Sequence, residues 1–234
     1  MIITIDGPAG AGKSSTAQAV ADRLDMRYLD TGALYRAVAW VLLEAGDAPT
    51  DEQARMLLAD ATIDLAFDED DTLVVTAQGR VITEAIRTSD VGDMASQVAA
   101  LPAVREYLLP VQRKLADRWS QTDGGVVADG RDTGTIVFPN ADLKIYMHAS
   151  LDERARRRWA EYQQDAENPP SLEDVREEIR TRDQADRNRD IAPLRRPEDA
   201  VELDTTCLSF EEQVEAIQKL VIDAMLGTDL PTSH

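Results

Sequence analysis

Residues 7–14 have the sequence GPAGAGKS and match the phosphate-binding pattern G-x-x-x-x-G-K-[ST] at every required position. In this pattern, backbone N–H groups at a helix start surround phosphate oxygens, Lys13 reaches the β- and γ-phosphates, and the Ser14 hydroxyl is a ligand for Mg²⁺. We therefore expect a nucleoside triphosphate to bind here. The expected contacts with it come from Gly7, Pro8, Ala9, Gly10, Ala11, Gly12, Lys13, Ser14 and Ser15.

The use made of the triphosphate must be inferred from other residues, because switch GTPases, motors and small-molecule kinases share this loop. A GTPase should carry an N-K-x-D guanine-reading motif, and no Asn precedes a Lys anywhere in the chain. A motor would usually be larger, or basic if it acts on nucleic acid, whereas this chain has 234 residues and a net charge of −19. The sequence therefore favours a small-molecule kinase.

The stretch RDQADRNRDIAPLRR (182–196) concentrates arginine in an acidic chain. Arg182, Asp186 and Arg189 are spaced i, i+4 and i+7, which places them on one face of a predicted helix. Planar guanidinium groups suit bidentate binding of phosphate, and an Arg–Asp–Arg face suits a ligand with an anionic end and a hydroxyl-bearing sugar. The spacing alone fits an exposed helix with i,i+4 ion pairs at least as well.

A carboxylate ends a buried strand in the middle of the chain. The apolar run GGVVAD closes at Asp129, where a Walker-B-type carboxylate would steady Mg²⁺ or its waters. An Asp at a strand end is also a common turn residue, so both roles stay open at this point. The candidate metal ligands are Ser14 and Asp129.

Strands and amphipathic helices alternate along most of the chain, which indicates an α/β fold with a parallel sheet. Residues 62–86 interrupt this pattern with three β-rich runs and predict a small insert of three antiparallel strands. Pro110 is expected to kink or divide the helix that contains it. The helices are expected near 13–24, 32–46, 50–60, 89–100, 103–119, 150–164, 171–190 and 209–226, and the core strands near 1–7, 124–129, 142–149 and 201–206.

The composition fits one buried core with small inserted subdomains, since 43% of the residues are hydrophobic and 29% are charged. No apolar run reaches about 18 residues and no secretory pattern opens the chain, so we expect a cytoplasmic protein without a membrane partner. The 44 acidic against 25 basic residues argue against nucleic-acid binding and fit either a salt-adapted host or a surface that favours solubility. Cys207 and His148 give no functional signal.

Four further segments closely resemble bacterial cytidylate kinases, which belong to the nucleoside monophosphate (NMP) kinase family of P-loop proteins. They are YLDTGALYRA (28–37), ITEAIRTSDVGDMASQVAALPAVRE (82–106), ADGRDTGTIVFPNA (128–141) and RDQADRNRDIAPL (182–194). The resemblance implies a three-layer P-loop kinase core with a central parallel sheet, a small three-stranded NMP-binding insert and a helical lid. The implied segments are core with the P-loop (1–61), insert (62–86), core (87–150), lid (151–195) and core (196–234).

The resemblance also implies roles for residues that would read the nucleobase. Asp132, Ser96 and Arg105 correspond to residues at the edge of cytosine. A carboxylate accepts from the exocyclic amine N4, and Arg donates to O2 and N3, whereas uracil lacks the amine. Tyr35 either packs along the base or has a plain core role.

Other residues are implied to hold the phosphates and the sugar. Arg36 and Arg131 hold the phosphate of the monophosphate, with Thr31 beside them. Arg182 and Asp186 correspond to contacts with the sugar hydroxyls, and Arg189 to a contact nearer the phosphate or base. The full set implied to contact CMP is Thr31, Tyr35, Arg36, Ser96, Arg105, Asp129, Arg131, Asp132, Arg182, Asp186 and Arg189.

The first arm of the implied lid, RARRRW (154–159), should face the ATP. Arg154 or Arg157 would make that contact, and spacing does not decide between them. Arg157 is counted here among the ATP contacts. Arg195 and Arg196 are expected to be surface residues.

These residues and the resemblance imply a kinase that uses MgATP to phosphorylate CMP or dCMP, giving ADP and CDP or dCDP. Lys13, Arg131, Arg182 and Arg189 would stabilise charge on the transferred group. The alternatives are a P-loop kinase for another small acceptor, such as UMP, AMP or a shikimate-like molecule, and a non-catalytic nucleotide-dependent regulator. A monomer is the simplest expectation, while the preference between CMP and dCMP and the salt dependence of activity stay open.

Overall fold

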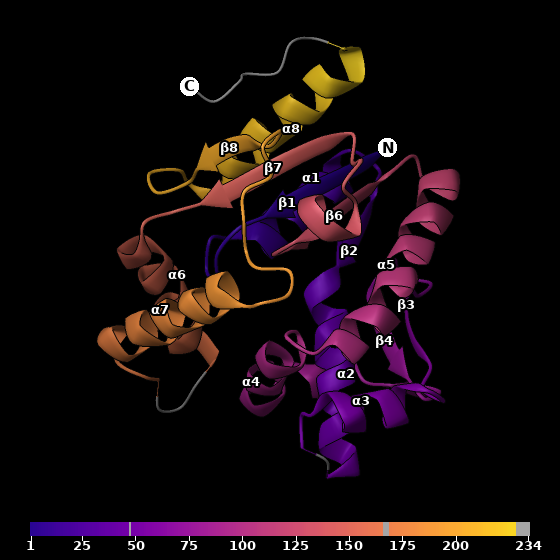
Figure 1. Cartoon of the computed structure of the whole chain (residues 1–234). Coiled ribbons are helices and arrows are strands. Elements are labelled where there is room, and N and C mark those ends of the chain that lie inside the picture. The colour runs from indigo at the N-terminus through magenta and orange to yellow at the C-terminus, as the bar shows by residue number, and fades with distance from the viewer. Residues whose placement is uncertain (47, 166–168, 228–234) are drawn as a thin grey trace. The chain divides into compact units, whose positions relative to one another are not determined.

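The computed structural model describes residues 1–46, 48–165 and 169–227 of the chain. The chain folds into two compact units, each described here by itself (Figure 1). The first unit comprises residues 1–29 and 119–234, and the second comprises residues 30–118. The division into core, insert and lid that the resemblance implies stays a prediction.

A five-stranded sheet in the order β2-β6-β1-β7-β8 forms the centre of the first unit. β1 pairs in parallel with β6 on one side and with β7 on the other, and β7 pairs in parallel with β8. β1 is the central strand, and its apolar side chains Ile3 and Ile5 are fully buried because they pack in the core with helical side chains that cover the sheet. The strands are β1 (Ile2–Asp6), β2 (Arg27–Asp30), β6 (Val126–Gly130), β7 (Leu143–His148) and β8 (Val201–Asp204).

The predicted α/β fold with a parallel sheet is confirmed, and one strand of it was missed. β2 has the sequence RYLD, and its four residues include only two that are fully buried. A strand this short, with a charged residue at each end, gives too little apolar periodicity to stand out from the neighbouring helices.

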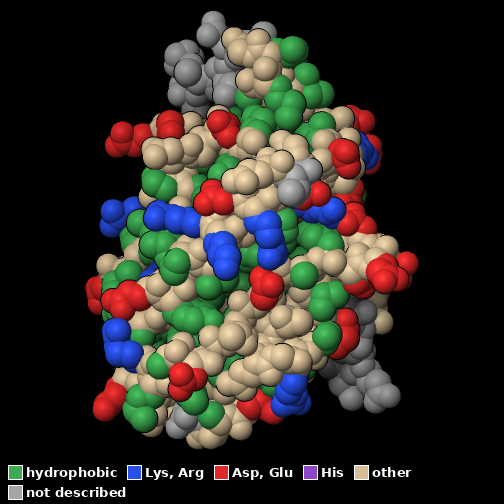
Figure 2. All heavy atoms as spheres, turned by 90° about the vertical axis from the view of Figure 1, so that its right-hand side faces the viewer, with side chains coloured by type: hydrophobic (Ala, Val, Ile, Leu, Met, Phe, Trp, Pro, Cys, Tyr) green, Lys and Arg blue, Asp and Glu red, His purple; other side chains and the backbone are tan. Residues whose placement is uncertain are grey.

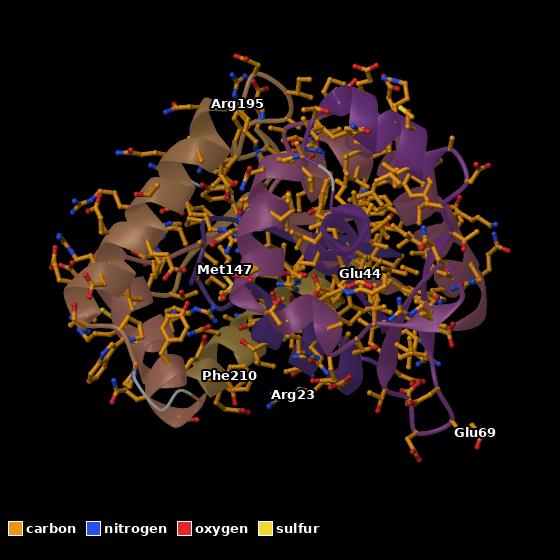
Figure 3. All side chains as sticks on the ribbon, turned by 90° about the horizontal axis from the view of Figure 1, so that it is seen from below. Arg23, Glu44, Glu69, Met147, Arg195 and Phe210 are labelled. Carbon is orange, nitrogen blue, oxygen red and sulfur yellow. The ribbon has the colours of Figure 1, made fainter. Side chains whose placement is uncertain are left out.

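Helices α1 (Lys13–Arg23) and α8 (Phe210–Leu226) pack against each other, and α1 also packs on β1 and β6. Their apolar faces join those of the sheet in one core that includes Val20, Ile217 and the fully buried Met147 (Figure 3). At the rim, Arg23 pairs with Glu211 in the first turn of α8, with 2.6 Å between Nη2 and Oε1. This core fixes the loop between β1 and α1, which carries the phosphate-binding motif.

Helices α6 (Leu151–Asp165) and α7 (Leu172–Asn188) lie side by side in the first unit (Figure 1). Their shared core is small: Ala155, Val175 and Ile179 are buried, while most other positions are polar. The helix starts expected at residues 150 and 171 are confirmed, because Ser150 Oγ accepts from the Glu153 amide and Ser171 forms a capping box with Asp174.

Helix α7 ends at Asn188, which corrects the prediction that Arg189 continues its face. Arg189 has an extended backbone with a ψ of 136°, and the chain then leaves the helix toward Pro193. Arg182 and Asp186 do lie one helical turn apart on α7.

The second unit combines helices with a three-stranded antiparallel sheet in the order β3-β4-β5. Helix α2 is buried along most of its length and packs against α4 and the sheet; Gly46 ends it in the left-handed conformation, as predicted. The elements of the second unit are α2 (Thr31–Ala45), α3 (Asp51–Leu58), β3 (Ile63–Phe67), β4 (Leu73–Ala77), β5 (Arg80–Val81), the 3₁₀ helix η1 (Ala85–Arg87), α4 (Ser89–Val98) and α5 (Pro102–Thr122). The last turn of α5 belongs to the first unit.

The predicted three-stranded antiparallel sheet is present, but its third strand is much shorter than the run 80–86. β5 ends at Val81, and the chain then turns into η1, where Ile86 is buried. The hydroxyl of Thr83 accepts from the amide of Val75 and takes the place of a further ladder bond. Pro110 does not divide α5, which runs through it as one helix.

The charge of the chain is carried mainly on exposed side chains. Figure 2 shows Asp and Glu side chains dispersed over one face, with fewer Lys and Arg among them. Arg195, which the sequence places on the surface, is exposed (Figure 3), and Arg196 pairs with Glu202. Within residues 1–46, 48–165 and 169–227, no helix is long and apolar enough to cross a membrane.

Candidate active site

The phosphate-binding motif lies between the end of β1 and the start of α1, as its sequence context predicted. Gly7 begins the loop with a φ of 155°, and a Cβ there would lie 1.9 Å from the Met147 carbonyl oxygen, so only glycine fits. The buried side chain of Lys13 folds back and donates from Nζ to the Pro8 carbonyl at 2.7 Å. The loop therefore has the P-loop form, with its lysine held inside.

A buried ion pair between Arg154 of α6 and Asp183 of α7 forms hydrogen bonds with the backbone of the same loop at Ala9. The Ala9 amide donates to Asp183 Oδ1 at 3.1 Å, and its carbonyl accepts from Arg154 Nη1 at 2.8 Å. Arg154 Nη1 also donates to Asp183 Oδ2 at 2.6 Å, and both side chains are nearly fully buried. Arg154 thus binds the protein loop itself, and its partner is Asp183, to which sequence reasoning assigned no role.

Arg157, the other arginine considered as an ATP contact, lies at the opposite end of the loop. It donates from Nη2 to the Thr205 carbonyl at 2.6 Å and from Nη1 to the Thr205 hydroxyl at 3.2 Å. The same Nη1 lies 3.4 Å from the Ala11 carbonyl. Arg157 therefore joins the P-loop to the turn after β8, and Thr205 is a member of this network that sequence reasoning missed.

The two candidate metal ligands are adjacent. Ser14 Oγ donates to Asp129 Oδ2 at 2.7 Å, and the Tyr28 hydroxyl donates to Asp129 Oδ1 at 2.9 Å. A hydroxyl beside a carboxylate is an oxygen donor set that suits Mg²⁺, which takes few protein ligands and completes its shell with water and phosphate oxygens. The described residues hold no cluster of three or more His, Cys, Asp or Glu able to bind a metal.

Three of the predicted arginines of the first unit, Arg131, Arg182 and Arg189, lie near one carboxylate, Asp186. Arg131 donates from Nε to Asp186 Oδ2 at 2.9 Å, and Arg189 Nη2 lies 3.8 Å from Asp186 Oδ1. Burial raises the pKa of Asp186, but the charges of Arg131, Arg189 and Arg182 outweigh that effect and hold its pKa below the ordinary value. Asp186 is thus ionised and organises the arginines around it.

The P-loop lysine lies close enough to two arginines and two carboxylates for their charges to shift its pKa. Burial lowers the pKa of Lys13 well below its ordinary value, and the charges of Arg131 and Arg182 lower it further, while Asp129 and Asp186 raise it. Arg189 has buried Nε and Nη2 atoms without a hydrogen-bond partner among the described residues. Since buried cations and unsatisfied donors cost stability, this arrangement favours an anionic ligand.

The second unit presents another group of the predicted residues on the first turns of α2. Asp30 caps the helix by accepting from the Ala33 amide at 2.9 Å, and it also pairs with Arg36 Nη2 at 3.0 Å. The Nε of Arg36 is buried and has no hydrogen-bond partner within the described part of the chain. Thr31 begins the helix and is buried.

Tyr35 and Arg105 form a pair within the second unit. Arg105 Nη1 donates to the Tyr35 hydroxyl at 2.7 Å, and the guanidinium lies 5.7 Å from the centre of the tyrosine ring. Tyr35 is half-buried, so its side chain lies partly in the core and partly at the surface of the second unit. Ser96 lies on α4 with its hydroxyl 3.4 Å from the Gly92 carbonyl.

The predicted residues therefore form two sets, each described within its own unit. Asp132 is buried and directly precedes a single π-helical turn, η2 (Thr133–Val137), that sequence reasoning did not anticipate. The second unit holds Thr31, Tyr35, Arg36, Ser96 and Arg105, and the first holds the P-loop, Asp129, Arg131, Asp132, Arg157, Arg182, Asp186 and Arg189.

The profile of the family described as Cytidylate kinase matches residues 3–223 of the chain. Two relatives named Cytidylate kinase are similar over almost their whole length. The one from Salinibacter ruber is 49% identical, covering 98% of this chain and 98% of its own, and the one from Geobacillus sp. is 48% identical, covering 94% and 95%. The Bifunctional pantoate ligase/cytidylate kinase of Trichodesmium erythraeum is 45% identical over 92% of this chain, which spans 40% of that protein.

Similarity to solved structures is lower. TT1252 from Thermus thermophilus has a TM-score of 0.46 at 20% identity, with 95% of this chain and 96% of that chain covered. A likeness at that level carries no conclusion about this chain.

Proposed function

The chain belongs to the cytidylate kinase family, and we propose that it transfers the γ-phosphate of ATP to CMP or dCMP, giving ADP and CDP or dCDP. One observation in the structure supports this most: the buried Lys13 lies in the P-loop, and the partly buried Arg131 and Arg189 both contact Asp186, whose pKa is held below its ordinary value. Two buried nitrogen atoms of Arg189 have no hydrogen-bond partner among the described residues and would be satisfied by an anion, so we propose that these cations bind the phosphates.

In the proposed reaction, an oxygen of the CMP phosphate attacks the γ-phosphorus of ATP in line with the bond to ADP, which breaks. The acceptor oxygen is already anionic, so no side chain needs to act as a strong base. Catalysis then consists of alignment and charge stabilisation. Lys13, Arg131, Arg182 and Arg189 are proposed to supply that charge.

The proposal includes Mg²⁺ held near Ser14 and Asp129, where it would neutralise phosphate charge when bound. The bond between Ser14 Oγ and Asp129 Oδ2 supports this, because it brings the two oxygen ligands to one place. Tyr28 fixes the carboxylate by donating to its other oxygen. Ser14 and Asp129 would thus supply the oxygen ligands, and Tyr28 would keep the Asp129 carboxylate oriented.

Selection of cytosine is proposed to depend on Asp132, Arg105 and Ser96. A carboxylate accepts from the N4 amine of cytosine and finds no donor at the O4 of uracil. Tyr35 is proposed to act through Arg105, since its hydroxyl accepts from that guanidinium. Arg36 and Arg131 are proposed to hold the phosphate of CMP, with Thr31 beside them, and Arg182 and Asp186 to bind the sugar.

We also propose which segments bind CMP and close over the site, where the protein resides in the cell and that it is a monomer. Residues 62–86 are proposed as the NMP-binding insert and 151–195 as a lid that closes over the phosphates and excludes water. Arg157 is proposed to contact ATP, on the basis of its position beside the P-loop carbonyl of Ala11. We further propose a cytoplasmic monomer that binds no membrane and, with a net charge of −19, no nucleic acid.

The proposal is tested by measuring ADP release from MgATP with CMP, dCMP, UMP, AMP and GMP as separate acceptors. Turnover dominated by CMP and dCMP is expected. Dominant turnover with another acceptor would keep the P-loop kinase and reject the base-reading roles. Slow ATP hydrolysis that no acceptor accelerates would instead favour the nucleotide-dependent regulator.

A further inference from the structure

Asp6 is a buried carboxylate that no part of the proposed reaction uses. It is the last residue of the central strand β1, directly before the P-loop, and its exposed fraction is 0%. In the sheet it lies opposite Gly130 of β6 and Tyr146 of β7. A carboxylate is rarely buried to this degree unless specific partners satisfy it, so its partners indicate its role.

Among the described residues, the hydrogen-bond donors to the Asp6 carboxylate all come from one turn. Its Oδ1 accepts from the Thr133 amide at 2.9 Å and from the Thr133 hydroxyl at 2.7 Å, and its Oδ2 accepts from the Gly134 amide at 2.7 Å. Burial raises the pKa of Asp6, while these three hydrogen bonds and the charge of Lys13 counteract the rise. Three donors converging on two oxygens are the arrangement that an ionised carboxylate accepts.

The turn that Asp6 binds is the π-helical turn Thr133–Val137. Its first amides have no partner within the turn and need an acceptor, which is usually the side chain of the residue just before it. That residue is Asp132, which makes no capping hydrogen bond. Asp6, 127 positions earlier in the chain, caps the turn instead, and Asp132 is relieved of that task.

Asp6 therefore anchors both ends of a two-residue segment. Gly130 is fixed at one end by the β1–β6 pairing, in which it lies opposite Asp6, and Thr133 is fixed at the other end by the Asp6 carboxylate. The turn is seated directly on β1: a Cβ on Gly134 would lie 2.8 Å from Thr4 Oγ1. Only Arg131 and Asp132 lie between the two anchors.

We propose that Asp6 is a positioning residue for CMP binding. By capping the turn that follows Asp132, a task that would otherwise fall to Asp132, Asp6 keeps Arg131 and Asp132 in position. This inference rests on the proposed function, which gives Arg131 the phosphate and Asp132 the base of CMP. Asp6 touches neither nucleotide in this account. Its loss should therefore affect CMP and the choice of base more than ATP.

The test compares Asp6→Asn with the wild-type protein in steady-state assays that vary CMP, UMP and ATP separately. The asparagine keeps the size of the side chain but replaces one acceptor oxygen with an NH₂ group, which leaves a turn amide facing a donor. We expect KM for CMP to rise about tenfold or more, the preference for CMP over UMP to fall, and KM for ATP to change less than about twofold. Equal rises in both KM values would place the effect in the P-loop and overturn the proposal.

Two further variants keep the test decisive. Thr133→Val removes one donor to Asp6 and leaves the carboxylate intact, so it should shift the same parameters in the same direction by a smaller factor; it decides the matter if Asp6→Asn does not fold. Thr4→Val is the matched control, because Thr4 lies on β1 beneath the same turn and its buried hydroxyl has no hydrogen-bond partner among the described residues. It should behave like the wild type.

The outcomes separate this inference from the function on which it rests. A wild-type protein that does not phosphorylate CMP contradicts the proposed function itself. Normal wild-type turnover, combined with folded Asp6→Asn and Thr133→Val proteins whose CMP kinetics are unchanged, contradicts only the positioning role. A lower melting temperature with unchanged kinetics would likewise make Asp6 merely structural and overturn the proposal.

Discussion

At the scale of single residues, three buried carboxylates of the first unit, Asp129, Asp183 and Asp186, each have more than one cation or hydrogen-bond donor around them. Asp186 holds Arg131 and Arg189, Asp129 holds Ser14 and Tyr28, and Asp183 holds Arg154. The motif residues of this set could be predicted, because spacing and residue type specify them. Tyr28 and Asp183 could not, because their partners are 101 and 29 positions away in the chain.

Asp132 provides the first prediction at this scale. Asp132→Asn exchanges one acceptor oxygen for a donor, which suits the O4 of uracil better than the N4 amine of cytosine. We expect kcat/KM for CMP to fall by about 10- to 100-fold and the ratio of CMP to UMP turnover to fall with it. ATP affinity, measured by calorimetry, should be nearly unchanged. An equal loss of ATP affinity would contradict the base-reading role.

Lys13 provides a pH-dependent prediction. Its pKa is depressed in the free protein by burial first and by Arg131 and Arg182 next, so part of the population is neutral at alkaline pH. Bound phosphates favour the charged form and raise that pKa, so ATP binding should take up protons at about pH 8.5, where phosphate groups with a pKa of about 6 are already ionised.

The proton uptake is measured by titration calorimetry in buffers of different ionisation enthalpy. Lys13→Met is the control variant, since it removes the titrating group and should abolish the uptake even where weak binding persists. The same proton uptake in both proteins would show that another group titrates.

At the scale of elements, the sheet, the caps and the helix boundaries followed from the sequence where a strong local signal existed. Gly46 ended α2 and Ser171 began α7 as expected. The errors occurred where tertiary contacts decide: β5 is short because Ile86 turns inward, and α5 continues through Pro110. The π-helical turn could not be predicted, because its cap is supplied from β1.

The contact between α6, α7 and the P-loop predicts a large loss of stability when it is broken. Asp183→Ala leaves the Arg154 guanidinium buried without its carboxylate, which should cost about 3–5 kcal/mol of unfolding free energy in urea. Asp152→Ala is the matched control, because Asp152 and Arg176 also join α6 to α7 but at the surface, where such a pair contributes about 1 kcal/mol or less. Equal losses in the two variants would contradict the role of burial.

At the scale of the whole molecule, the net charge of −19 reflects an excess of carboxylates, most of which are exposed. Such an excess repels itself and destabilises the folded state at low ionic strength. The net charge can be read from the sequence. That Arg131 and Arg182 lie near Lys13 of the P-loop could not be, because it depends on how the fold places β6 and α7 beside α1.

This charge predicts that salt stabilises the protein. The melting temperature should rise when KCl is increased from about 0.01 M to 1 M, over which the screening length falls from about 30 Å to 3 Å. Differential scanning fluorimetry measures the shift. A melting temperature that falls steadily over the same range would mean that attractive surface pairs outweigh the repulsion.

The most direct test of the central claim follows the transferred group itself. ATP labelled on its γ-phosphate is incubated with the protein, Mg²⁺ and CMP, and the products are separated and counted. Direct transfer predicts that the label appears in the β-phosphate of CDP, with one CDP formed for each ADP. Label that appears as inorganic phosphate, with no labelled CDP, would contradict a cytidylate kinase reaction by this chain.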